Sequence, residues 1–174
     1  VVAEVSVLDI CQFPHPVLKE EAQDVVEMND AVERLIQDMA ETMYHAPGVG
    51  LAANQVGVAK KIAVVDVSQK DEARNTMIIV NPRIIETGEE TEVMEEACLS
   101  VPDLSSEVER AIRITVLGKD LKGEDVKLEA EGFLARVLQH EIDHLYGTLF
   151  IDRLGKLKRQ KYIRQRKKAV QNDK

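Results

Sequence analysis

The segment His140-Glu141-Ile142-Asp143-His144 constrains this chain more than any other feature. It lies in a stretch from about Gly132 to Tyr146 whose apolar residues recur at helical spacing, which predicts a helix. Residues four apart lie on one face of a helix, so both imidazoles can reach a single metal ion. Glu141 would then lie beside that ion, where it can take a proton from bound water. The pattern predicts a helix that carries a catalytic metal site.

A catalytic metal of this kind usually needs a third protein ligand. Phe150 stands where metzincins have a third histidine, and Glu141 is the last glutamate in the chain, which excludes the downstream glutamate of thermolysin-like peptidases. Asp152 is the only nearby downstream carboxylate, but its spacing from His144 is unfavourable. The third ligand is therefore expected upstream, and Cys98 is the strongest candidate by ligand type.

The remaining hydrophobic patterns predict an α+β fold, because strands and helices do not alternate regularly as they do in βαβ units. A stripe of apolar residues predicts a helix over 29–45, with Asn29 or Asp30 as its cap, and a basic segment predicts another over 156–170. Lys122-Gly123 resembles a hairpin turn. The expected strands are Lys61–Val67, Met77–Val80 closed by Asn81-Pro82, Arg113–Leu117 and Asp125–Glu129.

Charge divides the 174-residue chain into two parts. Residues 1–152 carry a net charge of −17 and residues 153–174 a net charge of +9, so the main part should repel nucleic acid while the last segment attracts it. The two cysteines, Cys11 and Cys98, lie far apart, and the sequence has neither a secretory pattern nor an apolar run of membrane length. A reduced, cytoplasmic protein without a membrane partner is therefore expected, which disfavours a Cys11–Cys98 disulfide.

Three ordered motifs resemble those of the peptide deformylase family. They are Gly48-Val49-Gly50-Leu51-Ala52-Ala53-Asn54-Gln55, Glu96-Ala97-Cys98-Leu99-Ser100 and Gln139-His140-Glu141-Ile142-Asp143-His144. The resemblance extends from the segment 13–19 to Leu154. One departure is visible, since the family usually has glycine where Ala97 stands, but the change removes no ligand. We therefore expect a catalytic domain over 1–154 and a basic C-terminal helix over 155–174.

The resemblance implies both the fold and the reaction. Antiparallel sheets should surround the central helix that bears the histidines, with a further helix at the C-terminus. The implied enzyme removes the formyl group from the N-terminal formyl-methionine of new polypeptides and releases formate. The implied ligands of its metal are Cys98, His140 and His144. Ferrous iron is the implied ion, and Zn²⁺, Ni²⁺ or Co²⁺ can substitute for it.

The resemblance also assigns roles around the metal. Glu141 acts as the base and then the acid, while the Gln55 side chain and the Leu99 backbone amide stabilise the oxyanion. The loop at Gly48 and Gly50 suits a peptide that pairs as an added strand. The candidates for binding the methionine side chain are equally explained as core residues: Val49, Gly50, Leu99, Phe133 and Val137.

The sequence leaves two other functions open, and it leaves the roles of several further residues undecided. The chain could be an HExxH metallopeptidase, or a non-catalytic metal-binding or ribosome-associated protein. The basic segment Lys156–Lys168 suits ribosome docking, although a solvated helix face explains it equally well. The supporting hypotheses are an ion pair between Glu96 and Arg110, supporting or purely structural hydrogen bonds from Ser100 and Gln139, and surface or capping roles for His15 and His45.

Overall fold

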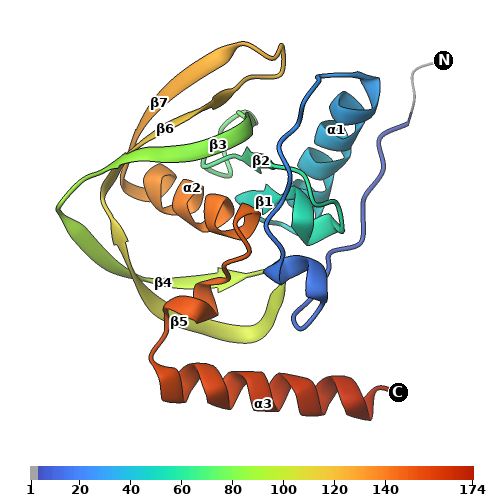
Figure 1. The fold of residues 1–174 in the computed structure, drawn as a ribbon, viewed down its shortest axis with the longest axis vertical. Coiled ribbons are helices and arrows are strands. Elements are labelled where there is room, and N and C mark those ends of the chain that lie inside the picture. Colours follow the sequence, from blue (N-terminus) through green and yellow to red (C-terminus); the bar gives the residue numbers. More distant parts are fainter. Residues whose placement is uncertain (1–3) are drawn as a thin grey trace.

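The computed structural model describes residues 4–174 and has the expected α+β architecture. Helix α2 lies between an antiparallel sheet of order β1-β2-β3-β6-β7 and the hairpin β4-β5 (Figure 1). The elements are η1 Pro16–Lys19, α1 Asp30–His45, β1 Gly50–Ala52, η2 Ala53–Val56, β2 Ile62–Val65, β3 Met77–Thr87, β4 Thr91–Cys98, β5 Val101–Ala111, β6 Arg113–Lys119, β7 Asp125–Glu131, α2 Gly132–Leu145, η3 Phe150–Arg153 and α3 Lys156–Asn172.

Two apolar helix faces build the core on either side of the sheet. The Asn29 side chain caps α1 by accepting a hydrogen bond from the Val32 amide at 3.0 Å. The stripe of α1 is buried against β1 and β2. The apolar side of α2 is buried against the sheet through Ala135, Leu138 and Leu145. Both predicted helices are therefore confirmed, since each places its apolar stripe in the core.

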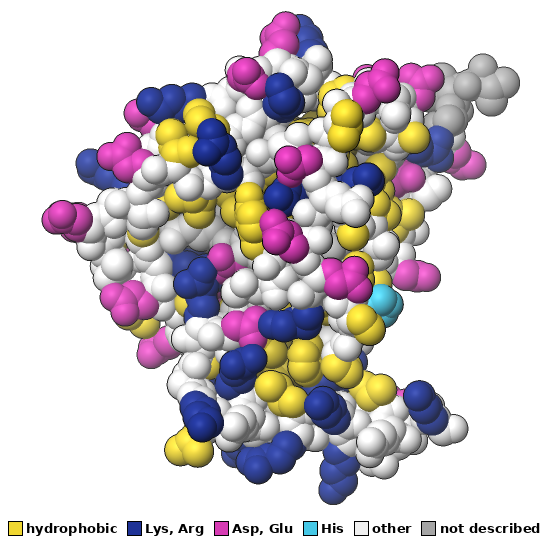
Figure 2. Space-filling model, in the orientation of Figure 1, with side chains coloured by type: hydrophobic (Ala, Val, Ile, Leu, Met, Phe, Trp, Pro, Cys, Tyr) yellow, Lys and Arg dark blue, Asp and Glu magenta, His cyan; other side chains and the backbone are white. Residues whose placement is uncertain are grey.

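The C-terminal helix α3 is docked on the main part of the molecule. Tyr162 is buried in a cluster with Phe13 and Phe150, and its hydroxyl donates to the Pro102 carbonyl at 2.9 Å. The Arg166 Nε donates to the Phe13 carbonyl at 2.8 Å. The opposite face of α3 is exposed and basic, and lies at the lower edge of the molecule in Figure 2. The predicted helix is confirmed, and one of its faces belongs to the core.

Strand β3 is longer than the predicted segment, which was expected to end at Asn81-Pro82. Asn81 has a φ of 51°, and the ladder between β3 and β6 shifts register between Val80 and Arg83. The Asn81 side chain accepts from the Val25 amide at 2.7 Å and donates to the Val25 carbonyl at 2.9 Å. The irregularity tolerates the missing N–H of Pro82, so the strand continues to Thr87.

The hairpin β4-β5 has no counterpart among the predicted strands. Its residues include many glutamates, which are depleted in strands, and Glu95 even lies opposite Glu107. The inward face buries the ion pair of Glu96 and Arg110 together with Val108, so apolar residues are only part of it. The hairpin predicted at Lys122-Gly123 is confirmed, because it joins β6 to β7 with Gly123 at a φ of 79°.

Over residues 4–174, each helix is too short or too polar to cross a bilayer. Cys11 and Cys98 are both free thiols.

Candidate metal and catalytic site

Cys98, His140 and His144 converge at the end of β4 and on one face of α2. The Cys98 Sγ lies 3.3 Å from the His144 Nε2, which lies 3.2 Å from the His140 Nε2. One donor atom from each of the three side chains falls within 4.8 Å of the others. The structure therefore brings the upstream cysteine to the two histidines. Asp152, the downstream alternative, instead binds Lys19 and Arg159.

The three donors fit a divalent metal ion. Bonds of about 2.0–2.3 Å to nitrogen and sulfur in a tetrahedral site place neighbouring ligand atoms about 3.3–3.6 Å apart. The two measured separations are close to that range. Two nitrogens and one thiolate with a position left open are typical of a catalytic site of the Zn²⁺ type, and the same set accepts Fe²⁺, Co²⁺ or Ni²⁺.

Glu96 sets the orientation of the His140 ring. Its Oε1 lies 2.9 Å from the His140 Nδ1, and Arg110 donates to both carboxylate oxygens at 2.9 Å. Burial alone would raise the pKa of Glu96, but the hydrogen bonds from Arg110 and His140 outweigh it and hold the pKa well below its usual range. Because an ionised carboxylate only accepts, the His140 Nδ1 donates to Glu96, which directs the Nε2 side of the ring toward the other two donors.

The electrostatics of the site favour a positive charge among these donors. Burial would lower the pKa of His140, but hydrogen bonds to Cys98 and Glu96 outweigh it and raise the pKa to about 10. Burial lowers the pKa of His144 well below its ordinary value, so that imidazole is neutral. The cluster therefore holds one cationic and one neutral ring. A divalent ion would supply positive charge at the same place.

Glu141 is a buried carboxyl group beside the ligand cluster. It is 4% exposed, and within residues 4–174 its Oε2 has no hydrogen-bond partner. Burial raises its pKa to about 7, although the charges of His140 and Arg110 act in the opposite direction. A carboxyl group with such a pKa can both take and return a proton near neutral pH, as general acid–base chemistry requires.

Gln55 points its amide nitrogen toward the ligand cluster. The Ala52 amide donates to its Oε1 at 2.9 Å, which fixes the direction of the side-chain amide. Its Nε2 donates to the Ser100 Oγ at 3.1 Å and lies 3.6 Å from the Cys98 Sγ. Ser100 therefore accepts a hydrogen bond from Gln55 and helps to hold that side chain, instead of orienting a metal ligand. The arrangement holds a neutral donor beside the position where a reacting oxygen would lie.

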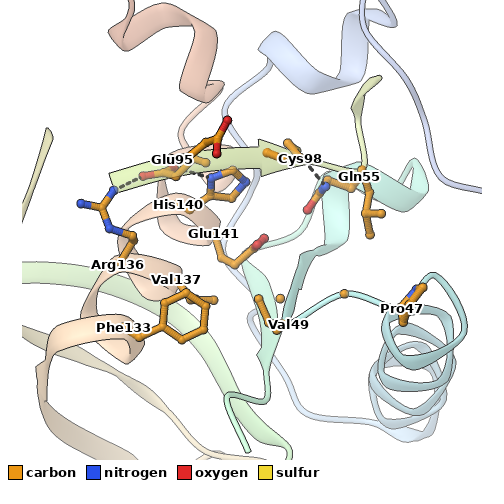
Figure 3. Close-up of a pocket in the computed structure, with 15 residues that line it drawn as sticks. Pro47, Val49, Gln55, Glu95, Cys98, Phe133, Arg136, Val137, His140 and Glu141 are labelled. Carbon is orange, nitrogen blue, oxygen red and sulfur yellow. Dashed lines mark hydrogen bonds and ion pairs between the residues drawn. The ribbon is translucent and has the colours of Figure 1, made fainter. Parts of the chain in front are cut away.

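An open, largely apolar cavity of about 410 Å³ lies against this cluster (Figure 3). Val49 and Phe133 line it and are about half exposed, whereas Val137 is buried at its wall. Gly50 and Leu99 also line it, and Gly48 lies so close that a Cβ there would be 3.2 Å from the Leu99 Cδ1. The residues predicted to contact substrate thus surround one cavity that reaches Glu141 and His140.

The residues predicted to support the site or to lie on the surface have different roles in the structure. The predicted Glu96–Arg110 ion pair is confirmed, and Arg110 also donates to Asp143 of α2 at 2.6 Å. Gln139 pairs with the backbone of Ala111, so its hydrogen bonds are structural. His15 caps η1 by accepting from the Val17 amide, and His45 is an exposed residue at the end of α1.

Sequence reasoning missed Arg136, which is buried and donates to the Glu96 Oε2 at 2.6 Å. The signal that could have found it is its position one turn before His140 on the same face of the predicted helix. It was overlooked because a single arginine in an apolar stripe has no motif of its own.

Comparison with known proteins gives one consistent result. Residues 7–160 match the family model of polypeptide deformylase. The peptide deformylase of Rhizobium meliloti is 48% identical over 158 residues, which are 91% of each chain. The crystal structure of peptide deformylase from Ehrlichia chaffeensis matches with a TM-score of 0.89 and 38% identity, over 97% of this chain and 99% of that one. A Met-Ala-Ser-bound peptide deformylase from Acinetobacter baumannii has a TM-score of 0.83 and 36% identity, over 87% of this chain and 100% of that one.

Proposed function

Since the chain belongs to the polypeptide deformylase family and is an enzyme of that class, we propose that it removes the formyl group from the N-terminal formyl-methionine of new polypeptides and releases formate. The observation that carries this proposal is the meeting of Cys98, His140 and His144 with Glu141 at one apolar cavity. The Met-Ala-Ser bound to the related Acinetobacter enzyme supports a substrate that begins with methionine.

The proposed chemistry divides between a metal and the side chains around it. Cys98, His140 and His144 would hold a divalent ion, which when bound supplies the Lewis acidity that makes water acidic near neutral pH. Glu141 takes the proton of the attacking water. Gln55 and the Leu99 amide donate hydrogen bonds to the charge that develops on the formyl oxygen. Glu141 then returns the proton to the departing amine, which separates formate from the peptide.

The cavity supports the proposed specificity. A formyl group is small, so it suits the space between Glu141 and Gln55, whereas the long methionine side chain suits the apolar walls formed by Val49, Phe133 and Val137. The edge strand β1 offers backbone groups along which a peptide can add as a further strand.

Purification without oxygen, followed by metal analysis and a formate-release assay, tests this proposal. We expect one divalent ion per chain, ferrous iron in the protein as made in the cell, and formate release from formyl-Met peptides. Cys98→Ala should lose metal and turnover together, whereas Cys11→Ala should lose neither, because Cys11 is not among the three converging donor residues. Full metal content in the Cys98 variant would contradict the ligand set.

The same assay separates the two other functions. A metallopeptidase would cleave internal or terminal amide bonds of the peptide and would not depend on the formyl group, so the matched unformylated peptide is the control. A non-catalytic binding protein would retain its function in Glu141→Gln, since binding requires no proton transfer. Cleavage of the unformylated peptide at a similar rate would favour the peptidase.

The proposal extends to docking of α3 on the ribosome. Leu157, Lys161, Arg164 and Lys168 recur every three or four residues and are exposed, with Leu157 82% exposed. Figure 2 shows Lys and Arg side chains gathered over this helix. A cationic helix on an otherwise acidic chain would orient the enzyme on a polyanion such as ribosomal RNA.

Charge reversal tests ribosome docking better than truncation, because Tyr162 and Arg166 belong to the packed face of α3. Lys161→Glu with Arg164→Glu and Lys168→Glu should weaken co-sedimentation with ribosomes and leave turnover of a short formyl-peptide unchanged. The matched control reverses three exposed lysines elsewhere, Lys70, Lys122 and Lys127. Equal sedimentation of both triple variants and the wild type at low salt would mean that the basic face of α3 is a solvated surface without a docking role.

A further inference from the structure

Arg136 connects α2 to both strands of the hairpin that ends at Cys98. Its Nη1 donates to the Glu96 Oε2 at 2.6 Å and to the Val108 carbonyl at 2.9 Å. Its Nη2 donates to the Glu92 carbonyl at 2.6 Å. Arg136 is 5% exposed, and Figure 3 shows it reaching from α2 toward β4. One buried side chain therefore holds the helix against β4 and β5.

Arg136 and His140 hold the two oxygens of a single carboxylate. They lie one turn apart on the same face of α2. Arg136 binds the Glu96 Oε2 and His140 binds Oε1, while Arg110 of β5 donates to both. Each oxygen of Glu96 thus has two donors, which leaves the carboxylate no freedom to turn. Any rotation of Glu96 would also rotate the His140 ring.

Glu96 precedes Cys98 by two residues on β4, so this carboxylate joins the strand of one proposed ligand to the helix of the other two. We propose that Arg136 is a positioning residue of the metal centre. By fixing Glu96 and the β4-β5 backbone, it sets the position of the His140 ring relative to the Cys98 side chain. This inference rests on the metal site of the proposed function. It adds a residue that is not among the proposed ligands of the ion.

The role requires the geometry of arginine and not only its charge. Three acceptors surround the guanidinium, and its planar fork of N–H groups reaches all of them at once. Lysine would keep the charge facing Glu96, but a single ammonium group on a flexible stem cannot bridge the carbonyls of Glu92 and Val108 as well. Methionine fills a similar volume and makes none of these bonds.

Cobalt binding tests the inference, because the visible spectrum of Co²⁺ reports ligand geometry independently of turnover. Arg136→Met should weaken Co²⁺ affinity, measured by chelator competition, by about 10–100-fold, the usual effect of removing a group that orients a ligand. Its ligand-field bands should differ from those of the wild type. The Co²⁺ affinity of Arg136→Lys should fall between those of the wild type and Arg136→Met. Arg113→Met is the matched control, since Arg113 makes an exposed ion pair with Glu131 at 3.2 Å, and its affinity should equal that of the wild type.

Urea unfolding of the metal-free chains separates positioning from general stability. Arg136→Met with lower stability but unchanged Co²⁺ affinity and spectrum would overturn the inference. If that variant does not fold, Arg136→Lys decides, and a wild-type affinity in it would overturn the inference as well. Cys98→Ala is included to test the metal site itself. Equal Co²⁺ binding by the wild type and Cys98→Ala would contradict the proposed function, and the role of Arg136 with it.

Discussion

A Cβ atom on Gly50 would lie 2.6 Å from the Glu141 Oε1 and 2.9 Å from its Cγ. Gly50 opens strand β1 and Glu141 lies on α2, so the strand passes the proposed base at a distance that only glycine allows. The backbone along which a peptide could pair is therefore in direct contact with the carboxyl group that would move the proton. This contact gives the glycine a chemical role that its motif alone does not explain.

Gly50→Ala should displace the Glu141 carboxylate and lower kcat by about 10–100-fold, because a misplacement near 1 Å is enough to cost that much. Metal content should stay unchanged, since no proposed ligand moves. Gly155→Ala is the control, because a Cβ there meets nothing within 4 Å among the described residues. An unchanged kcat in Gly50→Ala would show that Glu141 does not need its present position.

Glu141→Gln should retain the metal and lose about 10²–10⁴-fold in turnover, because the amide keeps the size of the side chain but cannot take a proton. The measurements are metal content and single-substrate kinetics on a formyl-Met peptide. Glu95→Gln, at the rim of the same cavity, makes the same chemical change on a side chain that is not proposed as the base. Near-full turnover in Glu141→Gln would remove Glu141 from the mechanism.

Gln55→Ala should lower kcat by about 10²–10³-fold and change KM far less, because its donor is proposed to act on charge that develops only in the transition state. Steady-state kinetics with the short peptide give both constants. The exposed Gln160 provides the control, and Gln160→Ala should match the wild type. An effect confined to KM would instead assign Gln55 to substrate positioning.

Asp66 should stabilise the fold at neutral pH and lose this effect in acid. Burial alone would raise its pKa, but hydrogen bonds from Ser68, Tyr44 and the Asn75 amide outweigh it and lower the pKa to about 2. Because the folded pKa lies below the ordinary value of 3.8, the stabilisation is present above about pH 4 and disappears as the pH falls toward 2. Its size at neutral pH should be on the order of 2 kcal/mol.

Urea unfolding of the wild type and Asp66→Asn between pH 7 and pH 3 measures this contribution. The difference in free energy of unfolding between the two chains should shrink as the pH falls, and taking the difference cancels the contributions of other groups. Asp71→Asn, which makes the same substitution at an exposed carboxylate in the same loop, is the matched control. A constant difference for Asp66→Asn would mean that its hydrogen bonds do not depend on its charge.

Local patterns in the sequence were enough for the helices and for two of the three proposed ligands. The stripe of α1 and the spacing of His140 and His144 depend on the period of the helix, which neighbouring residues reveal by themselves. The hairpin turn at Gly123 is equally local. Elimination and ligand type made Cys98 the strongest candidate for the third ligand. Its place in a family motif then implied that it is a ligand.

Tertiary structure decided what depends on residues far apart in the chain. The hairpin β4-β5 is rich in glutamates and lacks a strand pattern, because its inner face is neutralised by arginines that come from β5 and α2. Gly50 contacts Glu141, and Arg136 and His140 share Glu96; the residues of each contact lie 40 or more positions apart in the chain. Local periodicity cannot predict such pairs, because it indicates which face of an element is buried and not which residues pack against that face. The sequence by itself therefore determined the helix that carries the histidines, and only the folded chain decided how the residues around it are held.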